Sequence, residues 1–213
     1  EVIYTPPQDY ETIQELLTNL ENYINEPNDI DSLVNMAIIH HQFESIHPFY
    51  DGNGRTGRII NILYLILKDL LDIPVLYLSR YIITHKADYY RLLQEVRTED
   101  KWEEWILYML DAVEQTSLET IELINNISDL MIKTQDKISQ ELPKIYSKDL
   151  VEILFMHPYT KIDFLVDRLN ITRKTASKYL NELENIGILK NIQIKNSKFF
   201  INIELFNLLR KGI

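Results

Sequence analysis

The chain has 213 residues, of which 46% are hydrophobic, and it contains no cysteine. Disulfides and thiolate metal sites are therefore excluded. No stretch approaches the run of about 18 uncharged apolar residues that a membrane-spanning helix needs, and no signal peptide is visible. We therefore expect a cytoplasmic protein with no membrane partner. Because the chain begins at Glu1 and not at a methionine, we also expect that a longer protein has an upstream segment.

The net charge of −10 is unevenly distributed. Residues 1–140 hold 10 Lys and Arg against 24 Asp and Glu, a balance of −14, whereas residues 141–213 hold 12 against 8, a balance of +4. Such a shift predicts two domains with different partners. We expect a first domain over residues 1–120, a connecting helix over 121–140 and a second domain over 141–213.

Apolar residues recur at helical spacing through most of the first 140 residues. The pattern predicts helices over residues 9–25, 31–46, 59–71, 81–98, 101–115 and 117–140. Asp31 or Ser32 lies near the N-cap of the second helix, and Pro48 ends it. The third helix ends before Pro74. These expectations amount to a mainly helical first domain.

The last third of the chain has a different pattern. Short helices are predicted over residues 147–156, 161–168 and 172–187, followed by β-rich runs over 188–194 and 198–203. Three helices and a hairpin resemble a winged helix-turn-helix, a small α+β domain whose third helix can read a DNA groove. The basic residues on the third helix and beside the hairpin turn are Arg173, Lys174, Lys178, Lys195 and Lys198. Partners through this domain stay open between DNA and protein, and a homodimer is also open.

A run of twelve residues carries most of the chemistry: His47-Pro48-Phe49-Tyr50-Asp51-Gly52-Asn53-Gly54-Arg55-Thr56-Gly57-Arg58. A glycine-bearing loop that opens a helix exposes free N–H groups and the positive end of the helix dipole, which attract phosphate. Arg55 and Arg58 project from one helix face and suit phosphate groups. His47 can accept a proton, and Asp51 is a hard oxygen ligand suited to Mg²⁺.

Other phosphate-binding motifs do not fit this run. No lysine follows the glycines as a P-loop requires, and no β-rich stretch precedes them as in a dinucleotide-binding fold. A glycine turn that merely caps a helix would not need His47, Asp51 and two spaced arginines together. We therefore predict a site that holds a polyphosphate beside a histidine and a carboxylate.

The run resembles the signature of Fic-domain proteins, H-P-F-x-[DE]-G-N-G-R-x-x-R, at every defined position, and the likeness extends over about residues 1–120. Fic proteins with the complete motif are typically adenylyltransferases, which move AMP from ATP onto a Ser, Thr or Tyr hydroxyl of a protein and release pyrophosphate. The resemblance implies ATP and a protein hydroxyl as substrates, with the chain itself as one possible target. Alternatives are related transfer or removal chemistry and a nucleotide-responsive DNA-binding regulator.

The resemblance also implies roles for individual residues. His47 would deprotonate the target hydroxyl, and Asp51 would hold Mg²⁺. The nucleotide would be bound by the loop and the helix start, with Arg55 on the β-phosphate and Arg58 on the γ-phosphate; the full set of ATP-binding candidates is Asp51, Gly52, Asn53, Gly54, Arg55, Thr56, Gly57, Arg58, Tyr89 and Tyr90. The side chain of Asn53 and the backbone from Gly52 to Gly54 would surround the α-phosphate. Tyr89 and Tyr90 either border the adenine or belong to the core.

Two departures from the family pattern and two structural expectations complete the analysis. The inhibitory helix that often restrains Fic enzymes, with a glutamate that pairs with the second arginine, has no match in this sequence, so we expect it upstream. Val2-Ile3-Tyr4 is the only candidate for the second strand of the target-docking flap. We expect His40 and His41 to form structural hydrogen bonds, and Trp102 and Trp105 to lie in the core.

Overall fold

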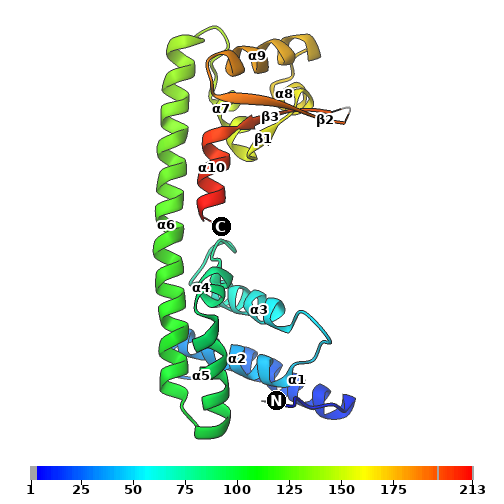
Figure 1. Ribbon diagram of the computed structural model, residues 1–213, viewed down its shortest axis with the longest axis vertical. Helices are drawn as coiled ribbons and strands as arrows, with labels where there is room; N and C mark the ends of the chain where they lie inside the picture. Colours follow the sequence, from blue (N-terminus) through cyan, green and yellow to red (C-terminus); the bar gives the residue numbers. More distant parts are fainter. Residues whose placement is uncertain (1–3, 196, 213) are drawn as a thin grey trace. The chain divides into compact units, whose positions relative to one another are not determined.

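The computed structural model describes residues 4–195 and 197–212, with side chains as far as residue 210 (Figure 1). Val2 and Ile3 of the expected flap strand, and Asn196 of the expected hairpin turn, lie outside the described residues. The chain divides into two compact units, Glu1–Leu118 and Glu119–Ile213. Each unit has its own cluster of buried apolar side chains. The predicted mainly helical fold with a small α+β part is confirmed.

The first unit is helical throughout its regular structure. Its elements are α1 (Tyr10–Asn25), α2 (Ser32–Ile46), α3 (Asn53–Leu67), α4 (Leu78–Thr84), α5 (Lys86–Glu99) and the first part of α6 (Trp102–Glu141). The predicted starts of α1 and α2 are confirmed: Asp9 accepts from Thr12 N–H, and Asp31 accepts from Leu33 N–H, both at 2.8 Å. A carboxylate there satisfies an N–H group that the helix leaves unpaired.

The core of the first unit surrounds α2. Met36, Ala37 and Ile39 on this helix are fully buried, and Trp105 of α6 is fully buried beside them. The indole N–H of Trp105 donates to Ala37 O at 2.9 Å, which joins the two helices through a buried polar contact. The prediction that the tryptophans belong to the core is confirmed, with Trp102 partly buried against the same cluster. A helix buried on most of its faces holds its last turn in a fixed place.

The helix after the motif differs from its prediction. It begins at Asn53 rather than at residue 59, so both motif arginines are helical, and it ends at Leu67 rather than at residue 71. The early end has a local cause: Asp69 takes left-handed backbone angles (φ 56°), and Leu70 N–H donates back to Leu65 O at 2.9 Å. This pattern closes a helix terminus and uses its free carbonyls.

Three other predicted helices have different limits. The segment predicted as one helix over residues 81–98 is split at His85 into α4 and α5. Thr84 Oγ1 donates to the carbonyls of Arg80 and Tyr81, and such side-chain bonds compete with helix continuation. Conversely, the helices predicted over 101–115 and 117–140 are one continuous helix, α6. Thr116 Oγ1 bonds to Ala112 O at 2.6 Å within the helix, and no Gly or Pro interrupts this stretch.

The second unit contains the predicted three helices and hairpin. After the last part of α6 come α7 (Lys148–Met156), β1 (Tyr159–Thr160), α8 (Ile162–Leu169), α9 (Arg173–Asn185), β2 (Leu189–Ile194), β3 (Ser197–Asn202) and α10 (Ile203–Gly212). The strands form an antiparallel sheet in the order β1-β3-β2, with Ile194 opposite Ser197 at the turn. Leu165, Leu180 and Phe200 are fully buried between the helices and this sheet.

Two elements of the second unit were not predicted. β1 is two residues long, too short for any periodicity, and exists because Tyr159 and Thr160 pair with Ile201 and Phe200. α10 follows directly from β3, and Asn202 Oδ1 accepts from Leu205 N–H at 3.2 Å at its start. No helix within residues 4–195 and 197–212 has both the length and the apolar character required of a bilayer-crossing segment.

Candidate active site

The loop between α2 and α3 bends sharply at two residues. His47 follows α2 with left-handed backbone angles (φ 50°, ψ 54°), and its N–H still donates to Phe43 O at 3.0 Å. Gly52 precedes α3 with φ 90°, a conformation that a residue without a Cβ adopts at little cost. The end of α2 and the N-terminus of α3 consequently border the same cavity.

Asn53 closes this loop. Its Oδ1 accepts from Phe49 N–H at 2.9 Å, and its Nδ2 donates to Phe49 O at 2.6 Å. Asn53 is only 2% exposed. The sequence predicts that this amide contacts a phosphate, whereas in the structure both of its polar atoms hold the loop together. The backbone N–H of Asn53, rather than its side chain, is therefore the group that can bind an anion.

The N-terminus of α3 provides unpaired backbone donors. The first hydrogen bond of the helix joins Thr56 N–H to Gly52 O at 2.9 Å, so the N–H groups of Asn53, Gly54 and Arg55 lie ahead of it. These groups and the helix dipole favour a negatively charged ligand at the start of α3. Their position agrees with the phosphate-binding chemistry expected from the motif.

The cavity beside the loop has a volume of about 410 Å³. His47 is exposed at its edge, at the end of α2. Most of the predicted site residues line it together, namely His47, Asp51, Gly52, Asn53, Gly54, Arg55, Arg58, Tyr89 and Tyr90. A histidine, a carboxylate, two guanidinium groups and a helix N-terminus therefore share one cavity large enough for a small-molecule ligand.

Asp51 and Arg55 form an ion pair across the first turn of α3. Asp51 Oδ2 and Arg55 Nη2 are 3.2 Å apart, and the two side chains are 84% and 72% exposed. An exposed pair of this kind contributes between about 0 and 1 kcal/mol. It is therefore easily exchanged, and both groups are available to a cation or a phosphate that enters the cavity.

Arg58 is held more firmly than Arg55. Its Nε donates to Ser79 Oγ at 2.7 Å, which connects α3 to the start of α4. The remaining guanidinium nitrogens face the cavity wall near Gly54, where Nη1 lies 3.2 Å from the point that a Cβ on Gly54 would occupy. Glycine at position 54 thus leaves room for Arg58 to approach the loop.

Two predicted ATP-binding residues lie outside the cavity. Thr56 Oγ1 donates to its own helix at Gly52 O, at 3.1 Å. Gly57 is buried against α2, where a Cβ would lie 3.1 Å from His40 Cε1 and 3.2 Å from Glu44 Oε1. In the structure both residues shape the helix and its packing and do not line the cavity.

The two adjacent tyrosines differ in environment. Tyr89 is 2% exposed, its hydroxyl is hydrogen-bonded to His40 Nε2 at 2.8 Å, and its ring packs near Trp105. Burial raises the pKa of Tyr89 well above its usual value. Tyr90 is 58% exposed and lines the cavity with Lys86, whose Nζ lies 5.7 Å from the Tyr90 ring centre. Of the two, Tyr90 has the exposed ring.

The expectation that His40 and His41 form structural hydrogen bonds is confirmed. His40 bonds to Tyr89, and His41 Nε2 is hydrogen-bonded to Leu93 O at 3.2 Å. Burial lowers the pKa of each imidazole to about 4, because the charged form loses its hydration. Both side chains are therefore neutral at physiological pH and bind α5 to α2.

Glu44 is a cavity residue that the sequence analysis did not single out. It lies one turn before His47 on α2 and is 8% exposed. Burial raises the pKa of its carboxyl, and the positive charges of His47, Arg58 and Arg97 oppose that rise. A usable sequence signal exists, since Glu44 is the only acidic residue of this largely apolar helix.

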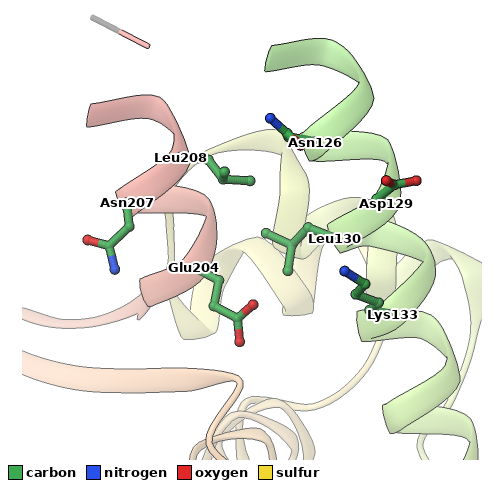
Figure 2. Close-up of a pocket in the computed structure, with 7 residues that line it drawn as sticks. All are labelled: Asn126, Asp129, Leu130, Lys133, Glu204, Asn207 and Leu208. Carbon is green, nitrogen blue, oxygen red and sulfur yellow. The ribbon is translucent and has the colours of Figure 1, made fainter. Parts of the chain in front are cut away.

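A separate cavity of about 300 Å³ lies in the second unit between α6 and α10 (Figure 2). Figure 2 shows Leu130 and Leu208 between the helices, with Asp129 and Lys133 on α6 and Glu204 on α10. The described side chains around it include neither histidine nor arginine. It therefore lacks the histidine base and the arginine side chains that distinguish the cavity in the first unit.

Comparison with known families gives two matches along the chain. The model described as Fic/DOC family matches residues 1–65, which contain the whole motif from His47 to Arg58. The model described as protein adenylyltransferase SoFic-like, C-terminal domain matches residues 130–205, within the second unit. The chain thus carries a Fic/DOC-family match at its start and a SoFic-like C-terminal-domain match in the second unit.

Two curated proteins are similar to the chain over parts of its length. It is 35% identical over 79 residues to a probable protein adenylyltransferase of Aquifex aeolicus, covering 37% of this chain and 24% of the relative. It is 27% identical over 145 residues to a protein adenylyltransferase of Caenorhabditis elegans, covering 67% of this chain and 27% of the relative. The chain thus spans about a quarter of the length of these relatives.

A solved structure resembles the chain over most of its residues. A Fic family protein from Desulfovibrio desulfuricans G20 aligns with a TM-score of 0.51 and 21% identity, covering 92% of this chain and 56% of the other. At this level of identity the likeness concerns the fold.

Proposed function

We propose that this chain transfers AMP from ATP to a hydroxyl of Ser, Thr or Tyr, in a target protein or in itself, and releases pyrophosphate. The observation that carries the proposal is the shared cavity, which is lined both by His47 and by the residues at the start of α3. The names of the two curated relatives, both protein adenylyltransferases, support the same reaction.

The proposed chemistry is a substitution at the α-phosphorus. The target hydroxyl oxygen forms a bond to this phosphorus while the bond to the departing pyrophosphate breaks. His47 takes the hydroxyl proton, a role that an imidazole can fill as a general base. The side chain is exposed at the edge of the cavity, where a hydroxyl from another protein has access.

Charge stabilisation would come from groups fixed by the fold. The helix start would stabilise the phosphate charge through the N–H groups of Asn53, Gly54 and Arg55. The loop before this helix is held in place by the two Asn53–Phe49 hydrogen bonds. Arg58 is oriented by Ser79. Such donors are already in place before substrate arrives, which lowers the cost of reorganisation during transfer.

The residues present fit a Mg²⁺ ion as cofactor. Asp51 offers an exposed carboxylate next to the phosphate donors, and Mg²⁺ is usually held by one or two carboxylates together with substrate phosphates. A bound Mg²⁺ would neutralise phosphate charge. Within the described residues no group of three His, Cys, Asp or Glu side chains is arranged to hold a metal, so Asp51 with the nucleotide is the proposed donor set.

Adenine binding is proposed for the exposed face of Tyr90, while Tyr89 supports it from the core. Tyr90 and Lys86 lie on α5 across the cavity from the loop. Because ATP is the proposed substrate, a cytoplasmic location is part of the same proposal. The proposed target is any protein that presents a Ser, Thr or Tyr hydroxyl to the cavity.

The test uses the chain with Mg²⁺ and ATP labelled at either the α- or the γ-phosphate, followed by intact mass spectrometry. We expect label from the α-position alone and a mass increase of one AMP on the chain or on a protein from a lysate. His47→Ala should abolish the transfer, whereas His157→Ala, an exposed histidine of the second unit, should not.

Other outcomes separate the alternatives. Label from the γ-position would indicate phosphorylation, and transfer only from another nucleotide would indicate related Fic chemistry. Loss of AMP from a modified protein would indicate the reverse reaction. Transfer that persists in His47→Ala would overturn the proposed role of the histidine.

DNA contact by the second unit is a second proposed function. On α9, Lys174 and Lys178 are exposed and four residues apart, so they share one helix face. The hairpin lies next to this helix, because Lys198 Nζ is 3.4 Å from Asn181 Oδ1. Exposed cations on a helix and an adjoining hairpin suit a phosphate backbone. A protein partner and a homodimer remain predictions.

A further inference from the structure

Glu44 is a buried acid in the wall of the candidate active site. It is 8% exposed and lines the cavity that also holds His47 and Arg58. Among the described residues, its Oε1 has no hydrogen-bond partner. A buried carboxylate oxygen without a donor is unfavourable, so compensation must come from nearby charges or from a function.

Two motif glycines create the space that Glu44 occupies. Glu44 Oε1 lies 3.2 Å from the position of a Cβ on Gly57 and 3.4 Å from that of a Cβ on Gly54. A side chain at position 57 would press on the carboxylate and on His40, whereas a Cβ at position 54 would make an ordinary contact with the carboxylate. The close approach of α3 to α2 therefore seats the carboxylate directly beneath the loop and the first turn of α3.

The groups that face Glu44 are mostly cationic or neutral donors. From α2 come His47, one turn further along, and the neutral His40; from α3 comes Arg58; from α5 come Arg97 and Tyr89. His47 is the largest of the charge interactions on the carboxyl. Arg58 and Arg97 also donate to Ser79 and Ser45. Arginine side chains keep their charge, whereas an imidazole gains a positive charge when it accepts a proton.

We propose that Glu44 is a positioning residue whose buried carboxylate stabilises the protonated form of His47. The inference deepens the proposed function, in which His47 takes the proton of the target hydroxyl. The imidazolium that results keeps this proton and carries a new positive charge next to a carboxylate that burial shields from water. Low exposure makes the attraction larger than the same pair would have on the surface.

The first test needs no enzymatic activity. The titration of His47 is followed by NMR in the free chain and in Glu44→Gln, which keeps the side chain's size and removes its charge. We expect the His47 midpoint to fall in Glu44→Gln, because the negative charge that favours the imidazolium is gone. Glu95→Gln is the control, because it removes a charge from α5 where the carboxylate pairs with Arg91. An unchanged or higher His47 midpoint in Glu44→Gln overturns the proposal.

A reciprocal test remains valid even where Glu44→Gln fails to fold. His47 is exposed, so His47→Ala leaves the core intact. Because coupling between two titrating groups is mutual, removing the imidazolium should raise the midpoint of the Glu44 carboxyl by a similar amount. Carbon NMR of the labelled carboxyl measures it. A Glu44 midpoint that does not move in His47→Ala overturns the proposal.

The kinetic test separates this inference from the proposed reaction. For AMP transfer we expect Glu44→Gln to lower kcat, shift the acidic limb of the pH profile to lower pH and leave KM for ATP unchanged. A drop in activity with an unshifted acidic limb counts against Glu44 acting through His47. If the parent chain transfers no AMP, the proposed function is wrong. The two NMR titrations would still show whether Glu44 and His47 interact.

Discussion

Asn53 and Phe49 are joined by two hydrogen bonds that run in opposite directions between one side-chain amide and one backbone unit. The pair spans the motif loop from its third residue to the first residue of α3. It explains how a loop that contains two sharply bent residues stays in a single shape. The same two hydrogen bonds fix the orientation of the backbone N–H groups at the start of α3.

Replacing Asn53 should loosen the loop. In Asn53→Ala both Phe49 groups lose their partner, and we expect the first unit to be destabilised by about 1–3 kcal/mol. AMP transfer should fall at least about tenfold, since misplaced donors weaken transition-state binding. Urea unfolding monitored by tryptophan fluorescence and a transfer assay check both effects. Asn25→Ala at the exposed end of α1 is the control, and equal losses in the two variants would contradict a specific role for the loop closure.

Gly57 should not tolerate a methyl group. A Cβ there would lie 3.1 Å from His40 Cε1 and 3.2 Å from Glu44 Oε1, both on the packed helix α2. Alanine gains up to about 1 kcal/mol in helix propensity, but overpacking costs about 1–3 kcal/mol, so we expect net destabilisation of about 1 kcal/mol. Gly54→Ala is the comparison on the same helix, because its tightest contact is the flexible end of Arg58. A Gly57→Ala protein more stable than Gly54→Ala would show that α2 and α3 separate easily.

The buried histidines should make the first unit sensitive to acid. His40 and His41 have a pKa of about 4 in the folded chain, below the value of about 6.5 for an unfolded histidine. The unfolded state therefore binds more protons, and stability present above pH 6.5 is lost as the pH falls toward 4. Between pH 7 and pH 5 we expect a loss of about 2 kcal/mol for each histidine.

Both tryptophans lie in the first unit, so their fluorescence reports its unfolding. Urea titrations at pH 7, 6 and 5 measure the loss of stability. His41→Gln should reduce the pH dependence by about half, while His157→Gln in the second unit should leave it unchanged. A parent chain equally stable at pH 7 and pH 5 would mean that these imidazoles are not buried in neutral form.

Some elements of the fold could be predicted from the sequence and others could not. The starts of α1 and α2 were predictable because Asp9 and Asp31 act on N–H groups two or three residues away. Periodicity located most helices, but it did not place the start of α3 inside the glycine loop, since that start depends on Asn53 closing onto Phe49. β1 depends on pairing with a strand about forty residues further along, which no local pattern records.

In the candidate site, too, some features could be predicted from the sequence and others depend on tertiary packing. The types and spacing of His47, Asp51, Arg55 and Arg58 indicated the chemistry of the motif, and the structure brings these residues into one cavity. Glu44 was missed because its burial results from the packing of α2 against glycines of α3. The different environments of two adjacent tyrosines likewise follow from the tertiary position of α5, which the dipeptide itself does not specify.

Asp51 should determine the response to metal. We expect chelation of divalent cations to stop AMP transfer and added Mg²⁺ to restore it. Asp51→Asn keeps the size of the side chain but removes its charge, and should lower the rate at a fixed Mg²⁺ concentration at least about tenfold, with partial recovery as Mg²⁺ is raised. Asp72→Asn, an exposed carboxylate after α3, is the control. Identical Mg²⁺ dependence in the parent chain and Asp51→Asn would remove Asp51 from the proposed donor set.

DNA binding by the second unit should depend on the basic face of α9. Each Lys–phosphate contact contributes about 0.9 to the slope of log affinity against log salt, so Lys174→Ala with Lys178→Ala should reduce the slope by about two. Lys144 and Lys148 are also exposed, four residues apart and in the same unit, so their double alanine variant makes the same change in charge elsewhere. Fluorescence anisotropy with labelled duplex DNA over a salt series measures both. Equal slopes in the two double variants would assign any binding to net charge rather than to α9, and a parent chain that does not bind duplex DNA at low salt would exclude this function.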